Sequence, residues 1–196
     1  TSDTEIYGVL ADLARGSLIG FDPVAAKARI EALPWVERAS VGRELPDRIV
    51  IDIRERVPYA VWQTGAELIV VDATGRLLAK SDAASAAKLG LPRIVGDGAP
   101  ERARAFHAEI AAFPRLARRL AAAEFVAGRR WTLHMTGGLS VLLPSAGIKE
   151  TLARLDQLQE RDQILDRAAV TLDLRGSDRL FVDPRPASAA PRRLPG

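Results

Sequence analysis

Apolar and polar residues alternate in one short segment of the chain, with the period of a strand that buries one face. Three isoleucines, Ile49, Ile51 and Ile53, carry the apolar phase, because side chains two residues apart share a face of a strand. The chain from Val36 to Arg43 is also expected to be extended, and Leu45-Pro46-Asp47-Arg48 has the residues of a turn. The pattern predicts a two-stranded meander.

Helical periodicity precedes this meander. A capping-box pattern, Ser2 followed by Glu5, opens the first predicted helix. The second begins with Asp22 as its N-cap and Pro23 at its first position, because proline has no N–H to lose there and its φ suits a helix. Two helices and a meander indicate a small α/β unit.

This unit covers residues 1–56 and is expected to need a third strand, since two strands alone bury too little apolar surface. No strand pattern precedes Ser2. Two explanations stay open: the unit is truncated, or residues 36–37 contribute more than the pattern indicates.

The remaining chain mixes the two periods. Strands are predicted at 67–72, 76–79, 131–135, 139–143, 170–174 and 179–183, and helices at 100–112, 115–124 and 148–159. Residues 81–100 are rich in Ala, Gly and Pro and are expected to form a loop around Leu91–Ile94, while residues 187–196 are expected to be a disordered tail. The predicted fold class is α+β: the α/β unit, then a mainly antiparallel β domain with flanking helices over 57–186.

Composition excludes some classes of function. The 196 residues are 47% apolar, enough for a core, and the net charge of +3 does not indicate a nucleic-acid-binding protein. Without cysteine there is no disulfide or thiolate metal site. No apolar run has the length of a membrane helix, and no signal peptide opens the chain.

The sequence offers little chemistry for an enzyme. Its two histidines, His107 and His134, have no carboxylate cluster nearby in the sequence, a pattern that does not indicate a metal site. Arg129-Arg130 are more easily read as surface charge than as an anion site. We expect no catalytic residue, metal or cofactor, and a hydrolase built on the two histidines remains the alternative of a different class.

The last predicted strand suggests a binding surface. Alternation puts Leu180 and Val182 on one face and Arg179, Phe181 and Asp183 on the other. If this strand is also a sheet edge, its unpaired main-chain groups can take up a partner strand, with Phe181 as the anchor. Packing of Phe181 under the tail or under helix 148–159 is the alternative.

Several segments together resemble the periplasmic part of the bacterial cell-division family FtsQ (DivIB in Gram-positive bacteria). They are SDTEIYGVL, DPVAAKARIEALPWV, LPWVERASV, LPDRIVIDIRERVPYAVW, LIVVDATGRLL, RRWTLHMTGGLSVLLP and VTLDLRGSDRLFV. The resemblance implies a POTRA domain, whose first strand would precede Thr1, followed by the family's β domain. It further implies a periplasmic portion of a single-pass inner-membrane protein at the division septum, with the membrane helix upstream.

The resemblance also implies partners. The family recruits FtsB and FtsL, with a segment of FtsB adding to the last strands of the β domain, and the POTRA domain contacts other divisome proteins. Carried over, that surface lies on Arg175, Gly176, Ser177, Asp178, Arg179, Leu180, Phe181 and Val182. Family members can carry tyrosine where this chain has Gly176, so Phe181 is expected to take over as the anchor.

Three further expectations follow from the resemblance. Arg129 or Arg130 matches an arginine near that interface. Glu55 and Pro58 lie at the junction of the two domains. A POTRA-bearing component of outer-membrane assembly or secretion is the alternative within the same fold.

Overall fold

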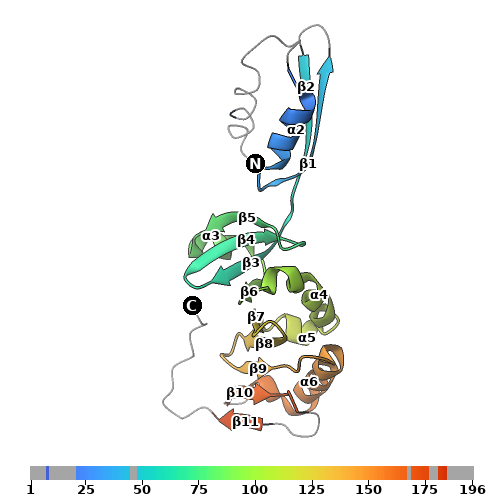
Figure 1. Ribbon diagram of the computed structural model, residues 1–196. Helices are drawn as coiled ribbons and strands as arrows, with labels where there is room; N and C mark the ends of the chain where they lie inside the picture. Colours follow the sequence, from blue (N-terminus) through green and yellow to red (C-terminus); the bar gives the residue numbers. More distant parts are fainter. Residues whose placement is uncertain (1–7, 9–20, 45–47, 167–168, 177–180, 185–196) are drawn as a thin grey trace. The chain divides into compact units, whose positions relative to one another are not determined.

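The computed structural model describes residues 8, 21–44, 48–166, 169–176 and 181–184 (Figure 1). For Ala169 and residues 181–184 it describes the backbone alone. The chain divides into two compact units, Thr1–Val57 and Pro58–Gly196. The first predicted helix (apart from Gly8), most of the predicted 45–48 turn and the predicted tail lie outside the described residues.

The smaller unit contains helix α2, Pro23–Glu31, which begins where the sequence predicts it. Asp22 Oδ1 accepts hydrogen bonds from the backbone N–H groups of Val24 and Ala25 at 2.9 and 3.2 Å. Pro23 occupies the first helical position, where a proline costs no hydrogen bond. The predicted start of this helix is confirmed.

The predicted meander is confirmed as strands β1, Val36–Glu44, and β2, Arg48–Glu55, which pair antiparallel. Their inner face packs against α2 around a small buried cluster of Ile30, Val36 and Ala39. Four further residues are partly buried against this cluster: Leu33, Val41, Ile51 and Ile53. Among the described residues this sheet has two strands.

The larger unit is built on one sheet of nine strands. Its strands are β3 Pro58–Thr64, β4 Glu67–Asp72, β5 Leu77–Ser81, β6 Arg93–Val95, β7 Leu120–Val126, β8 Arg130–Met135, β9 Ser140–Leu142, β10 Ala169–Asp173 and β11 Phe181–Pro184. Its helices are α3 Ala83–Leu89, α4 Ala99–Ala111, α5 Pro114–Ala117, α6 Ile148–Asp162 and the 3₁₀ turn η2 Ile164–Asp166.

The strand order across this sheet is β11-β10-β9-β8-β7-β6-β3-β4-β5. The pairs β3/β6, β6/β7 and β9/β10 are parallel, and the other pairs are antiparallel. The predicted fold class, α+β with mainly antiparallel pairing, is therefore confirmed, and the parallel pairs make the sheet mixed.

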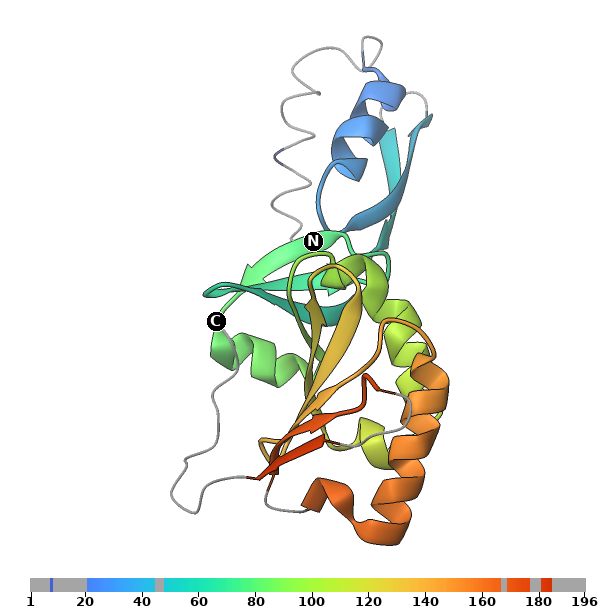
Figure 2. The same cartoon turned by 60° about the horizontal axis from the view of Figure 1, so that its bottom comes forward.

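Helices α4, α5 and α6 lie along one side of the sheet in both views (Figure 1, Figure 2). The core between them holds Phe106 from α4, Leu116 from α5, Leu152 and Leu155 from α6, and the alternating residues of β7 to β10. The ring of Phe106 stacks on Trp131 with 4.5 Å between centroids. The helices thus bury one face of the central strands.

The predicted helix over 115–124 is wrong. Only Pro114–Ala117 is helical, and Leu120–Val126 is strand β7, which pairs with β6 on one side and β8 on the other. Leucine and alanine favour a helix by intrinsic propensity. The central position in the sheet overrides that preference, because Ala122 and Ala123 are fully buried there.

Other predicted bounds also need correction. The loop expected over 81–100 contains α3, which Asp82 caps by accepting from the Ser85 N–H at 2.9 Å, and β6. The predicted helix 148–159 extends to Asp162. The last strand is described from Phe181 onward, and Arg179 and Leu180 lie outside the described residues.

Candidate partner-binding edge

Strand β11 stands at one end of the nine-stranded sheet. It pairs antiparallel with β10, so that Val182 is the register partner of Leu172 and Phe181 that of Asp173. On its other side β10 pairs parallel with β9. In the described part of the chain, β11 therefore has one neighbouring strand, and its outer side has none.

The two faces of β10 differ in character. Leu172 and Leu174 are buried in the core, while Thr171 and Asp173 alternate with them and are partly exposed. This alternation ties the end of the sheet to the core through one face and leaves the other face polar.

Two arginines act on the same carboxylate at this end of the sheet. The Arg175 guanidinium donates from Nε to both Asp173 carboxylate oxygens, at 2.9 and 3.0 Å, and the Arg175 backbone N–H donates to Oδ1 at 3.0 Å. These bonds lower the pKa of Asp173, and the charge of Arg130 on β8 adds to the effect. The structure thus brings Arg130 and Arg175, both expected from the sequence, toward one acidic group.

The other predicted residues fall into three groups. Arg129 is exposed in the turn before β8, and Gly176 is exposed after Arg175. Phe181 and Val182 are described as backbone in β11. Ser177, Asp178, Arg179 and Leu180 lie outside the described residues.

The predicted junction residues end one element and begin the next. Glu55 is the last residue of β2 and pairs with Val36. Pro58 opens β3, opposite Asp72, at the start of a strand, where proline is tolerated. The boundary between the compact units falls directly before Pro58.

The structure corrects the expectation about carboxylates near the histidines. His134 Nε2 lies 2.8 Å from Glu124 Oε2, and its Nδ1 lies 3.2 Å from Ser140 Oγ. Glu124 was missed because the sequence predicted helix there, whereas β7 and β8 bring it next to His134. His107 contacts a different group, the Tyr59 hydroxyl, at 3.3 Å.

These contacts resemble a serine hydrolase triad only superficially. In such a triad Nε2 faces the serine and Nδ1 the carboxylate, the reverse of the arrangement at His134. Ser140 is also the direct cross-strand partner of His134 in a regular ladder. The arrangement is that of a polar cross-strand row.

Two other kinds of site are absent from the described residues. No group of three or more histidine or acidic side chains there is placed to hold a metal ion. Within the same residues, no helix combines the length and apolar character needed to cross a bilayer.

Comparison with known families matches both units. The family model "Cell division protein FtsQ/DivIB, C-terminal" covers residues 60–175. The model "POTRA domain, FtsQ-type" covers residues 1–56.

Individual proteins named "Cell division protein FtsQ" are similar over most of the chain. That of Caulobacter vibrioides is 36% identical over 169 residues, which are 86% of this chain and 55% of that protein. That of Rhizobium radiobacter is 33% identical over 183 residues, 93% of this chain and 86% of that protein. That of Bradyrhizobium diazoefficiens is 35% identical over 178 residues, which are 91% of this chain and 52% of that protein. The chain spans about half the length of the Caulobacter and Bradyrhizobium relatives.

A solved structure is also similar: the major extracytoplasmic domain of the cell-division protein DivIB from Geobacillus stearothermophilus. It has a TM-score of 0.37 and 15% sequence identity, and the match covers 56% of this chain and 97% of that one.

Proposed function

The chain belongs to the FtsQ/DivIB family of cell-division proteins, and from that premise we propose that it recruits FtsB, and through it FtsL, to the division septum. The family acts as a non-enzymatic scaffold among other division proteins, and we extend this to the present chain. In this proposal a strand of FtsB adds to the outer side of β11.

The observation that carries the proposal is the terminal place of β11 in the sheet. A terminal strand presents a row of N–H and C=O groups that a partner strand can satisfy. Each such hydrogen bond contributes only about 0.5–1.5 kcal/mol net, so main-chain pairing gives affinity without much discrimination. Side chains beside the edge must supply the discrimination.

We assign that role to Phe181 and to the nearby arginines. Phe181 is the register partner of Asp173, whose carboxylate already pairs with Arg175. Arg130 lies close enough to Asp173 to lower its pKa, but the guanidinium of Arg130 makes no hydrogen bond or ion pair to a described residue. Because β8 lies three strands in from β11, Arg130 acts on a strand added to β11 only through the field of its charge.

The remaining assignments rest on the family. We place the chain in the periplasm, as part of a protein held in the inner membrane by a helix upstream. The smaller unit, which matches the FtsQ-type POTRA domain, then contacts other divisome proteins. Glu55 and Pro58 connect it to the β domain.

Hydrogen exchange tests the edge directly. Backbone amides from Arg175 to Val182 are followed in the free chain and with a peptide from FtsB. Strand addition predicts new protection on β11, because its outer N–H groups gain acceptors, while protection of β5 at the other end of the sheet stays unchanged. Uniform protection across the sheet, or none, would contradict the proposal.

A charge substitution tests the anchor. Phe181→Lys is expected to weaken FtsB binding about tenfold or more, as loss of an aromatic anchor does at other interfaces, while the sheet stays folded. Leu77→Lys is the matched control, because Leu77 is a 47% exposed apolar residue on β5, the opposite end of the same sheet. Equal binding by wild type and Phe181→Lys in a calorimetric titration would show that Phe181 is not part of the FtsB site.

A further inference from the structure

A pocket of about 250 Å³ lies beside α5 and α6. Among the described residues its lining consists of three arginines and one amide: Arg115, Arg118, Arg119 and Gln159. No described carboxylate is part of the lining. None of these residues belongs to β10 or β11, so the pocket is separate from the proposed FtsB edge.

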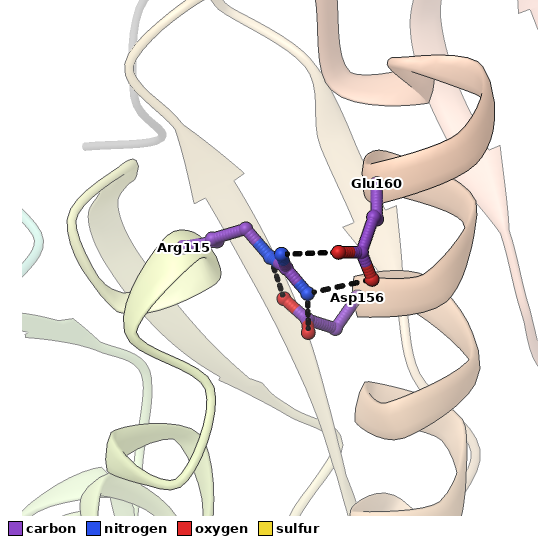
Figure 3. A network of polar contacts seen from close by, with 3 residues as sticks. All are labelled: Arg115, Asp156 and Glu160. Carbon is purple, nitrogen blue, oxygen red and sulfur yellow. Dashed lines mark hydrogen bonds and ion pairs between the residues drawn. The ribbon is translucent and has the colours of Figure 1, made fainter.

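Arg115 is fixed by two carboxylates of α6 (Figure 3). Its Nε and Nη2 donate to Asp156 at 3.1 and 2.7 Å, and its Nη1 and Nη2 donate to Glu160 at 3.0 and 3.1 Å. The bonds from Arg115 lower the pKa of Asp156. This guanidinium is therefore held in one orientation before any ligand arrives.

Arg119 is held by a second chain of contacts. Its Nη1 donates to Asp166, and Gln159 Nε2 donates to the same carboxylate at 2.8 Å. The Gln159 carbonyl oxygen in turn accepts from the Leu165 N–H at 2.8 Å. Gln159 is thus held in place at the wall of the pocket, and Arg119 Nε and Nη2 donate to no described residue.

Arg118 differs from its two neighbours. It is exposed, and no residue in the described ranges forms a hydrogen bond or an ion pair with its guanidinium. Asp156, Glu160 and Asp166 offset the charges of Arg115 and Arg119, so among the described residues Arg118 is the lining guanidinium left to pair with an anion.

The number of free donors indicates the class of ligand. A carboxylate is satisfied by the fork of a single arginine, whereas a phosphoryl group offers three oxygens and a higher charge, and so can accept from two guanidiniums at once. Arg118 and Arg119 are adjacent in sequence and both line the pocket. We propose that this pocket binds a phosphoryl group, with Arg118 as its principal contact and Arg119 as its second.

Inorganic phosphate is the first probe. It is titrated into the ¹⁵N-labelled 196-residue chain at constant ionic strength, and the arginine Nε–Hε signals are followed by NMR. The proposal predicts saturable shifts of the Arg118 and Arg119 signals. Arg118→Ala should weaken binding about tenfold or more, since a charge-assisted hydrogen bond is lost.

Arg104→Ala is the matched control, because Arg104 is an exposed arginine on α4 outside the pocket lining and its loss changes the net charge equally. It should leave phosphate binding within about twofold of wild type. Equal weakening by both variants, shifts that do not saturate, or acetate binding as tightly as phosphate would each overturn the proposal.

A second probe identifies the source of the phosphoryl group. Vesicles of phosphatidylcholine with phosphatidic acid are compared with vesicles of phosphatidylcholine alone. Sedimentation of wild type but not of Arg118→Ala with the acidic vesicles assigns a lipid headgroup. Saturable phosphate binding without sedimentation assigns a soluble phosphate ester. If the chain shows neither sedimentation with the acidic vesicles nor saturable phosphate binding, the proposed site is refuted. FtsB binding by Arg118→Ala is expected to be unchanged, which separates this proposal from the function proposed above.

Discussion

The two units of the chain bury apolar residues on very different scales. Among the described residues of the smaller unit, the buried cluster consists of Ile30, Val36 and Ala39, supported by partly buried neighbours. In the larger unit the buried cluster runs through the sheet from β3 to β10 and into α4, α5 and α6. Both units are compact, but within the described residues the cluster of the smaller unit has few side chains and that of the larger unit has many.

The difference teaches where each unit is vulnerable. A small domain buries a smaller fraction of its surface and has little stability to spare. Each core residue of the smaller unit must therefore carry a larger share of its stability. In the larger unit a single loss can be tolerated, and the sensitive positions should be those where backbone approaches backbone.

Equal core truncations in the two units give the largest expected effect. Ile30→Ala and Leu155→Ala both remove a fully buried side chain and should each cost about 2–5 kcal/mol. We expect Ile30→Ala to unfold the smaller unit and abolish hydrogen-exchange protection of α2, with β8 still protected. Leu155→Ala should lower the melting temperature of the larger unit without unfolding it at 25 °C.

Wild-type chain measured in parallel supplies the reference for both variants. Retained protection of α2 in Ile30→Ala would show that the smaller unit has other sources of stability. Loss of β8 protection in the same variant would show that the units do not unfold separately.

A glycine tests the larger unit at a close approach of two backbone segments. Gly96 has φ +95°, and a Cβ there would lie 2.4 Å from the Phe125 carbonyl oxygen of β7. Its own carbonyl accepts from Trp62 Nε1 at 2.9 Å. Gly96→Ala should therefore cost about 3 kcal/mol or more in a urea titration, from left-handed strain and overpacking together.

Gly65→Ala separates those two contributions. Gly65 also has a positive φ, +57°, but a Cβ there meets nothing within 4 Å. Gly65→Ala should therefore lower the free energy of unfolding by only about 1 kcal/mol, the contribution of the backbone strain alone. Similar values for the two variants would mean that the sheet adjusts around Gly96 and that backbone packing is not limiting.

How well the sequence predicts the fold depends on whether an element is determined by local signals or by contacts distant in sequence. Strand β4, Glu67–Asp72, and the start of α2 at Asp22 were predicted correctly, because alternation and capping are local signals. Strand β7 was not, because its Leu-Ala-Ala-Ala segment favours a helix locally and becomes a strand through partners far away in sequence.

The candidate site also has features that local sequence patterns predict and features that depend on strand pairing. The last strand and its place near the C-terminus could be predicted from alternation, but its terminal position in the sheet depends on the parallel pairing of β9 with β10, which no local pattern encodes. The approach of Arg130 to Asp173 depends on that pairing too. The contact of Glu124 with His134 was lost together with β7.

Substitutions of helix caps should have a smaller effect on stability. They allow a comparison of the two units, because an aspartate caps a helix in each. Asp22 caps α2 in the smaller unit, and Asp82 caps α3 in the larger one. Asp22→Ala should cost about 1 kcal/mol and lower the melting temperature of its whole unit. Asp82→Ala should release only α3, seen as faster exchange of its amides.

Asparagine at either position keeps a capping oxygen and should restore most of the protection. Equal, purely local exchange in both alanine variants would show that the smaller unit is not limited by its few contacts, and would weaken the comparison.

The smallest expected effect is a pH dependence confined to the larger unit, which contains both histidines of the chain. Burial lowers the pKa of His107 below its usual value near 6.5, so the unfolded chain binds this proton more readily than the folded one. The contribution of His107 to stability is therefore complete above about pH 6.5 and decreases as the pH falls below it. His107→Gln should remove that decrease, while the melting of the smaller unit stays flat between pH 7.5 and about pH 5.5 in both proteins. His134 is present in both proteins, so the difference between wild type and variant reports on His107. An unchanged pH slope in His107→Gln would mean that the ring, 3.3 Å from the Tyr59 hydroxyl, is protonated equally well in the folded and unfolded states.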